Sequence, residues 1–268
     1  MGKIGQAVRE LERADELARR DGMLTRLHPA GKLALTLLYL VCVLSCGKYD
    51  LPRLILLCVY PLVLFEIGDL SFPDAVKRLR IVLPLLLAVG AVNPFLDREI
   101  LFTVGSVPVS GGAVSMLSLF LKGALAVFAS YLLVLTTPVE KLCAALRRFH
   151  VPKIVVTELL LIFRYAGLLL REAERMSTAY ALRAPGQKGV AFRAWGSFLG
   201  QLLLRSMDRA EELYESMTLR GFEGEYPFAE CGPFRARDLI WVLLWSAALL
   251  SLRLLPAAEL LGRALAGA

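Results

Sequence analysis

Long apolar runs alternate with short polar segments through the first half of this chain, and one more run lies near its C-terminus. The runs contain almost no charged residues and approach the length that a helix needs to cross a bilayer. Such a pattern predicts an all-α membrane protein with about five membrane-spanning helices. The predicted spans are Leu33–Gly47, Leu54–Gly68, Ile81–Phe95, Ala113–Leu135 and Leu239–Leu255.

The first of these spans is short, and it reaches full length only if residues 27–32 join it, with the Lys32 ammonium extended toward the interface. Polar segments separate the spans: a turn at residues 48–50 and a loop at Ser71–Arg80. In the longer connection at 96–112, residues 100–109 alternate weakly between apolar and polar, which predicts a small hairpin.

Between the fourth and fifth spans the pattern changes to charged, amphipathic helices with apolar positions three and four residues apart. The sequence predicts a short helix, Val139–Phe149, opened by a proline, and a long helix from about Pro152 to Arg183. A loop at Gly186–Gly196 follows, and a second long helix then runs to Arg220.

Each long helix ends in an arginine beside a turn: Arg183 precedes Ala-Pro-Gly, and Arg220 precedes Gly221. The last residues of the two helices align at one constant separation in sequence, so that Leu182 matches Leu219 and Arg183 matches Arg220. Two interpretations remain open. The arginines are ordinary last-turn cations that complement the helix dipole, or they are a duplicated device for two matched pockets on a partner, where an arginine fork would bind a carboxylate.

Residues 154–170 are a competing span, but they contain Glu158 and Arg164, each costing about 2.5–3.5 kcal/mol at a helix centre. With five spans and a cytoplasmic N-terminus, 25 Lys and Arg residues lie inside and five outside, and the last of the 31 is Lys122. A sixth span would move Arg205 and Arg209 outside. We therefore expect the 152–183 helix to lie on or under the membrane.

Composition agrees with a membrane protein, since 57% of the residues are hydrophobic and the mean hydropathy is +0.60. Residues 1–26 form a basic amphipathic lead that suits either a bilayer surface or a solvated helix, and they lack the apolar core of a signal peptide. The expected organisation is this lead, spans one to four, a cytoplasmic helical segment, and the fifth span with its tail, with bounds 1–26, 27–136, 137–237 and 238–268.

The sequence offers little catalytic chemistry. It has no phosphate-binding Gly-x-x-x-x-Gly-Lys motif, so we do not expect it to hydrolyse ATP itself. Its five cysteines form no Cys-x-x-Cys pair, and Cys42 and Cys46 suit small apolar roles. His28 and His150 lie far apart beside prolines, where structural or surface roles are expected. We expect neither a metal site nor a bound cofactor.

Three polar residues of the predicted spans remain candidates for function. Glu66 and Asp69 share a helix end, where they would form a proton or cation site or contact a neighbouring subunit. Lys122 interrupts the fourth span, and an ionisable residue at that depth is a functional candidate. Alternatively, Lys122 pairs with Asp97 or Glu99, or extends to the interface.

Several motifs resemble the membrane coupling component, or T component, of energy-coupling-factor importers, in particular the cobalt-type CbiQ family. The similarity covers about residues 25–227 and is most specific in the helical segment. The motifs are Thr136-Thr137-Pro138-Val139-Glu140-Lys141, Ala145-Leu146-Arg147-Arg148, Val151-Pro152-Lys153, Phe163-Arg164-Tyr165, Leu182-Arg183-Ala184-Pro185-Gly186-Gln187-Lys188-Gly189 and Leu219-Arg220-Gly221-Phe222-Glu223-Gly224.

The resemblance implies a non-catalytic subunit of a bacterial or archaeal inner-membrane importer, with its N-terminus in the cytoplasm. Two ABC ATPase subunits would use the ATP and bind the two arginine motifs. A separate substrate-binding membrane subunit, with a small accessory one in some systems, would carry cobalt; no nucleic acid is involved. The family's motifs usually read Ala-Arg-Gly, whereas here they comprise Leu182, Arg183 and Ala184, then Leu219, Arg220 and Gly221.

Two alternatives to a cobalt-specific subunit stay open. The chain would be a shared coupling subunit that serves several vitamin-binding subunits, or a stand-alone secondary transporter that uses Glu66, Asp69 and Lys122. The large helical segment argues against a stand-alone transporter, because such a carrier has no use for it.

Overall fold

The chain folds into helices and one two-stranded hairpin in the residues that its computed structural model describes. Contacts within the chain divide it into two units. The first comprises Met1–Arg19 and Pro138–Cys231, and the second comprises Arg20–Thr137 and Gly232–Ala268. The described residues are 24–93, 100–104, 107–187, 189–224 and 234–254, together with 5, 13, 15–20 and 22.

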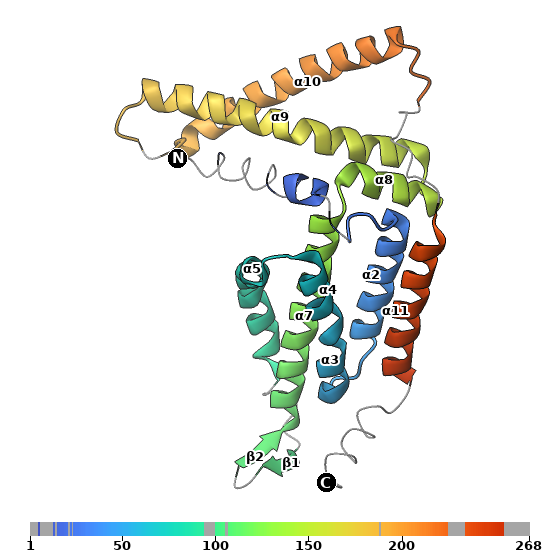
Figure 1. Cartoon of the computed structure of the whole chain (residues 1–268). Helices are drawn as coiled ribbons and strands as arrows, with labels where there is room; N and C mark the ends of the chain where they lie inside the picture. The colour runs from blue at the N-terminus through green and yellow to red at the C-terminus, as the bar shows by residue number, and fades with distance from the viewer. Residues whose placement is uncertain are drawn as a thin grey trace. The chain divides into compact units, whose positions relative to one another are not determined.

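The second unit is a helical bundle in which α7 packs against α2, α3, α4 and α5, while α11 packs against α2 and α3 (Figure 1). A hairpin of β1 and β2 precedes α7. The elements are α2 (Pro29–Leu44), α3 (Leu51–Leu57), α4 (Val59–Gly68), α5 (Phe72–Gly90), β1 (Ile100–Val104), β2 (Val107–Ser110), α7 (Gly111–Thr136) and α11 (Ala236–Leu254).

Aromatic rings fill the core of this bundle. The ring of Tyr39, which is fully buried, stacks on Tyr60 with 4.5 Å between centroids, and Trp245 meets Tyr60 edge-on at 5.1 Å. The Tyr39 hydroxyl donates a hydrogen bond of 3.1 Å to the carbonyl of Leu57, at the end of α3. A buried tyrosine needs such a partner, so this bond ties α2 to the point where α3 gives way to α4. The edge-on contact with Tyr60 places the half-buried Trp245 against the same core.

Three helices begin earlier than the apolar pattern predicts, because each has a proline in its first turn. Proline there loses no hydrogen bond and has its φ already set for a helix. The predicted polar loop at residues 71–80 is wrong. Those residues start α5, whose buried Ala75 and Leu79 lie one turn apart on the face toward the bundle. Lys77 is exposed, and the Arg78 guanidinium lies over the Tyr131 ring of α7.

By length and hydropathy, the described part of the chain contains two helical segments that could cross a membrane, Leu51–Gly68 and Gly111–Thr136, and one shorter apolar helix, Pro29–Leu44. The first of these segments is α3 and α4 together. The competing span at 154–170 lies within α9, which does not meet the same criteria. The arrangement with five spans stays a prediction.

The weak alternation at residues 100–109 is confirmed as a hairpin, since β1 pairs with β2 in antiparallel register. The Ser110 hydroxyl then accepts a bond from the amide of Ala113 and so caps α7. Asp97 and Glu99, proposed partners of Lys122, lie outside the described residues. So do Cys231, most of the 1–26 lead and the C-terminal tail from residue 255.

The first unit contains the predicted helical segment, with boundaries within one or two residues of those expected. A short 3-10 turn, η1, occupies part of the predicted loop at 186–196. Helices α9 and α10 pack against each other and cross, and α8 packs against the start of α9 (Figure 1). The elements are α8 (Val139–Arg148), α9 (Lys153–Arg183), η1 (Phe192–Ala194) and α10 (Trp195–Leu219).

Candidate functional site

The first predicted arginine motif forms the C-terminal end of α9. Arg183 is the last helical residue, its side chain is exposed, and the preceding Leu182 is 79% exposed. The amide of Ala184 bonds to the carbonyl of Tyr180 at 3.0 Å and closes the helix. The Tyr180 hydroxyl donates a 2.9 Å bond to the Gln187 side chain, which holds the following turn against the helix.

The second motif ends α10 in a Schellman turn. The amide of Phe222 bonds to the carbonyl of Met217 and the amide of Gly221 to that of Thr218, both at 3.0 Å. Gly221 has φ of +80°, the left-handed conformation that this turn requires at the residue after the cap. Arg220, the cap residue, is exposed, and Leu219 is 89% exposed.

The two ends therefore share an exposed leucine followed by an exposed arginine, on helices of similar length. They differ in the turn, because Ala184 stands where the second motif has a glycine with positive φ. Among the described residues neither arginine makes an ion pair, and both side chains are exposed. Figure 1 shows the two helix ends on opposite sides of the crossed pair.

Helix α8 supports the base of α9 through a small apolar cluster. Cys143 is buried with Val156 and Leu160 of α9. Burial raises the pKa of the Cys143 thiol, and the nearby Glu140 carboxylate raises it further. Glu140 also forms an ion pair of 3.4 Å with Arg19, which links the N-terminal lead to α8. Cys143 is therefore a packing residue with a protonated thiol at neutral pH.

Lys122 of α7 donates a hydrogen bond to the carbonyl of Cys46, just beyond the C-terminal end of α2. Arg253 of α11 joins it there, bonding the Ser45 carbonyl at 2.9 Å and the Ser45 hydroxyl at 3.1 Å. Helix α2 has no basic residue in its own last turn. Two neighbouring helices thus supply the cations that complement its dipole and its carbonyls.

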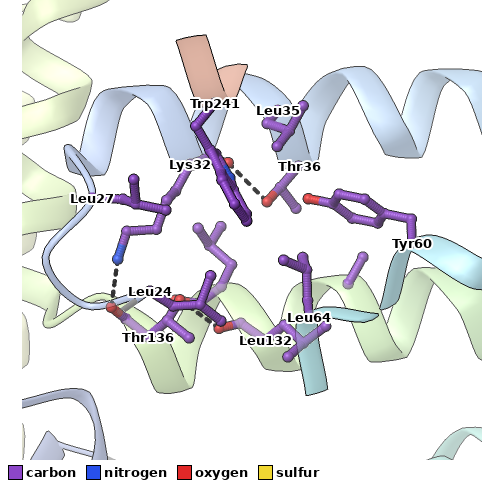
Figure 2. Close-up of a pocket in the computed structure, with 12 residues that line it drawn as sticks. Leu24, Leu27, Lys32, Leu35, Thr36, Tyr60, Leu64, Leu132, Thr136 and Trp241 are labelled. Atoms are coloured by element: carbon purple, nitrogen blue, oxygen red, sulfur yellow. Dashed lines mark hydrogen bonds between the residues drawn. The ribbon is translucent and has the colours of Figure 1, made fainter. Parts of the chain in front are cut away.

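Helix α7 also lacks a basic residue in its last turn, and Lys32 of α2 supplies one. Figure 2 shows the Lys32 ammonium bonded to the Thr136 carbonyl, at 2.7 Å, beside an apolar cavity of about 30 Å³. Lys32 therefore caps the C-terminal end of α7. Its extension toward the interface stays a prediction. Helices α2 and α7 each complete the other's C-terminal end, through Lys32 and Lys122.

Sequence reasoning singled out Lys122 but missed Arg253 and the partner of Lys32. A signal was present, because α2 and α7 both end without a local cation. Only the fold shows which distant lysine or arginine reaches each end.

His28 has the structural role expected of it. Its buried ring caps the N-terminus of α2 by accepting a hydrogen bond of 3.2 Å from the Ala30 amide.

Glu66 and Asp69 are both exposed at the C-terminal end of α4. They line an open groove of about 690 Å³ whose walls are apolar and include Phe65 and Phe72. A cation site and a subunit contact both stay predictions for this pair. Among the described residues no three His, Cys, Asp or Glu side chains gather as metal ligands, and the absence of a bound metal or cofactor stays a prediction.

A family model described as "Cobalt transport protein", CbiQ, matches residues 21–228 of this chain. The match includes the bundle from α2 to α7, the helices α8 to α10 and both arginine ends. The chain belongs to the CbiQ family. It is a membrane transport protein by this membership and by its apolar helices.

Individual relatives match stretches of different length. The "Nickel permease LarQ" of Lactiplantibacillus plantarum is 34% identical over 92 residues, 34% of each chain. The "Cobalt transport protein CbiQ" of Rhodobacter capsulatus is 33% identical over 91 residues, 34% of this chain and 37% of that one. An uncharacterized protein of Methanocaldococcus jannaschii is 23% identical over 240 residues, 85% and 81% of the two chains. The match thus spans only about a third of the named nickel permease.

Proposed function

We propose that this CbiQ-family chain is the T subunit of an energy-coupling-factor importer for cobalt or nickel ions. In this role it hydrolyses nothing and transmits the motion of two ATPase subunits to a substrate-binding membrane subunit. The observation that carries the proposal is the pair of helix ends at Arg183 and Arg220, each with an exposed leucine and a guanidinium free of ion pairs among the described residues.

Each arginine would bind one ATPase subunit, with the neighbouring leucine filling an apolar part of the same groove. The rigid helices α9 and α10 would carry the displacement, and five spans with a cytoplasmic N-terminus would hold the assembly in the membrane. Cobalt or nickel is the proposed substrate because named relatives of both kinds exist. The metal itself would bind to the separate membrane subunit, since we expect no metal site in this chain.

Purification of the native complex tests the proposed attachment. Arg183→Ala combined with Arg220→Ala removes both cations from helix ends without changing a buried residue, so the chain should still fold and insert. Losing one partner of a buried charged pair costs about 2–5 kcal/mol, so the ATPases should no longer co-purify. Arg209→Ala is the matched control, because Arg209 pairs with Glu212 of its own helix. Undiminished ATPase recovery with the double variant would refute the proposed docking.

A further inference from the structure

The crossing of α9 and α10 is held by a charged contact. Glu172 of α9, whose side chain is 24% exposed, forms an ion pair with Arg205 of α10. The same carboxylate lies 3.6 Å from Arg175, one turn along α9. One acidic side chain therefore holds two arginines, one from each helix.

The Glu172–Arg205 pair lies near the middle of α10, about three turns after its start. Phe198, Leu202 and Arg205 lie on one face, at steps of four and three residues. Phe198 is the one buried side chain of α10, a helix described along its whole length, and Leu202 is half-buried. Beyond Arg205, no residue of α10 is buried. Figure 1 shows this part of α10 diverging from α9 beyond the crossing.

From these contacts we infer that Glu172 is a positioning residue and that its pair with Arg205 is the pivot of the two helices. This inference rests on the proposed coupling function. Glu172 precedes Arg183 by eleven residues, and Arg205 precedes Arg220 by fifteen. At 1.5 Å per residue, the two arms are about 16 Å and about 22 Å long. A rotation at the crossing then displaces both arginine ends together.

The Glu172–Arg205 pair is suited to a pivot because it is polar and partly exposed. Such a pair sets the point at which α9 and α10 cross and still allows them to rotate about it. Exposed ion pairs contribute little to stability, and the helices should stay folded when it is lost. Neutralising Glu172 nevertheless leaves Arg175 and Arg205 facing each other without a carboxylate between them. Their repulsion should open the crossing and loosen the relation between the two ends.

A distance measurement on the isolated chain tests the pivot without any partner. Spin labels at Ala179 and Glu215, both exposed, report the separation of the two arms in a chain whose five native cysteines are replaced. We expect Glu172→Gln to broaden the distance distribution. The exchanged pair Glu172→Arg with Arg205→Glu should restore it. Glu212→Gln is the matched control, because Glu212 pairs with Arg209 within α10 and should change nothing.

An unchanged distribution in Glu172→Gln, or the same broadening in the control, would overturn the pivot. In the reconstituted importer, Glu172→Gln should lower the substrate moved per ATP hydrolysed by about fivefold, the size of a weak coupling between sites, and the exchanged pair should recover it. If the distances change and recover while transport does not respond, the pivot stands and the proposed coupling function fails.

Discussion

At the scale of single residues, the charged Lys122 side chain of the apolar helix α7 has a hydrogen-bond acceptor within the bundle. Its ammonium bonds the Cys46 carbonyl, and Arg253 bonds the adjacent Ser45 carbonyl. Carbonyls beyond a helix end need donors, and water is scarce in a bilayer. Capping α2 therefore accounts for Lys122 without a role in transport.

We expect Lys122→Met to lower the free energy of unfolding by about 1.5–3 kcal/mol, the value of a hydrogen bond to a charged group. Thermal denaturation in detergent measures this loss, and transport per folded molecule should stay normal. Lys77→Met is the control, because Lys77 pairs with Asp74 on the exposed face of α5 and should change stability little. A Lys122→Met protein of normal stability that no longer transports would show a functional lysine instead.

At the scale of helices, the close approach of α5 and α7 depends on Gly123. A Cβ at this position would lie 2.6 Å from the Leu86 side chain of α5. Such a contact is too short, so a larger residue must push Leu86 or the whole helix away. Gly200 of α10 has no neighbour within 4 Å of the corresponding position, and it provides a comparison in the same chain.

Gly123→Val should therefore lower the free energy of unfolding by about 1–3 kcal/mol through overpacking. Gly200→Val should leave stability unchanged or slightly higher, since valine is the better helix former. The midpoints of thermal denaturation of the Gly123→Val and Gly200→Val proteins, measured under the same conditions, test this difference. Equal tolerance at both positions would mean that α5 does not pack on α7 as described.

Sequence periodicity predicted α8, α9 and α10 closely, because their charged faces and their stops at Pro152, Gly186 and Gly221 mark each boundary. It failed at residues 71–80, where charge suggested a loop and Pro73 instead starts α5. The helix ends at Arg183 and Arg220 could be predicted because each arginine lies beside its own turn. The lysine caps and the Glu172–Arg205 pair were not, since their partners are distant in sequence and only packing brings them together.

For the whole molecule, the distribution of charge predicts which residues face the cytoplasm. With five spans, 25 Lys and Arg residues lie inside and five outside. A single cysteine at Gly189, in a chain without native cysteines, should be protected from an impermeant reagent added outside intact cells. A cysteine at Lys48, in the turn after α2, should react. Labelling at Gly189 from outside would place a span within α9 and reverse this topology.

The coupling role predicts that transport and ATPase attachment fail together. The direct measurement is ATP-dependent uptake of labelled cobalt by proteoliposomes that contain the whole importer. With Arg183→Ala and Arg220→Ala combined, we expect uptake to fall to the level seen without ATP, while the Arg209→Ala importer transports normally. Uptake at the normal rate by the double variant would contradict the account, because no cation would then remain at either helix end.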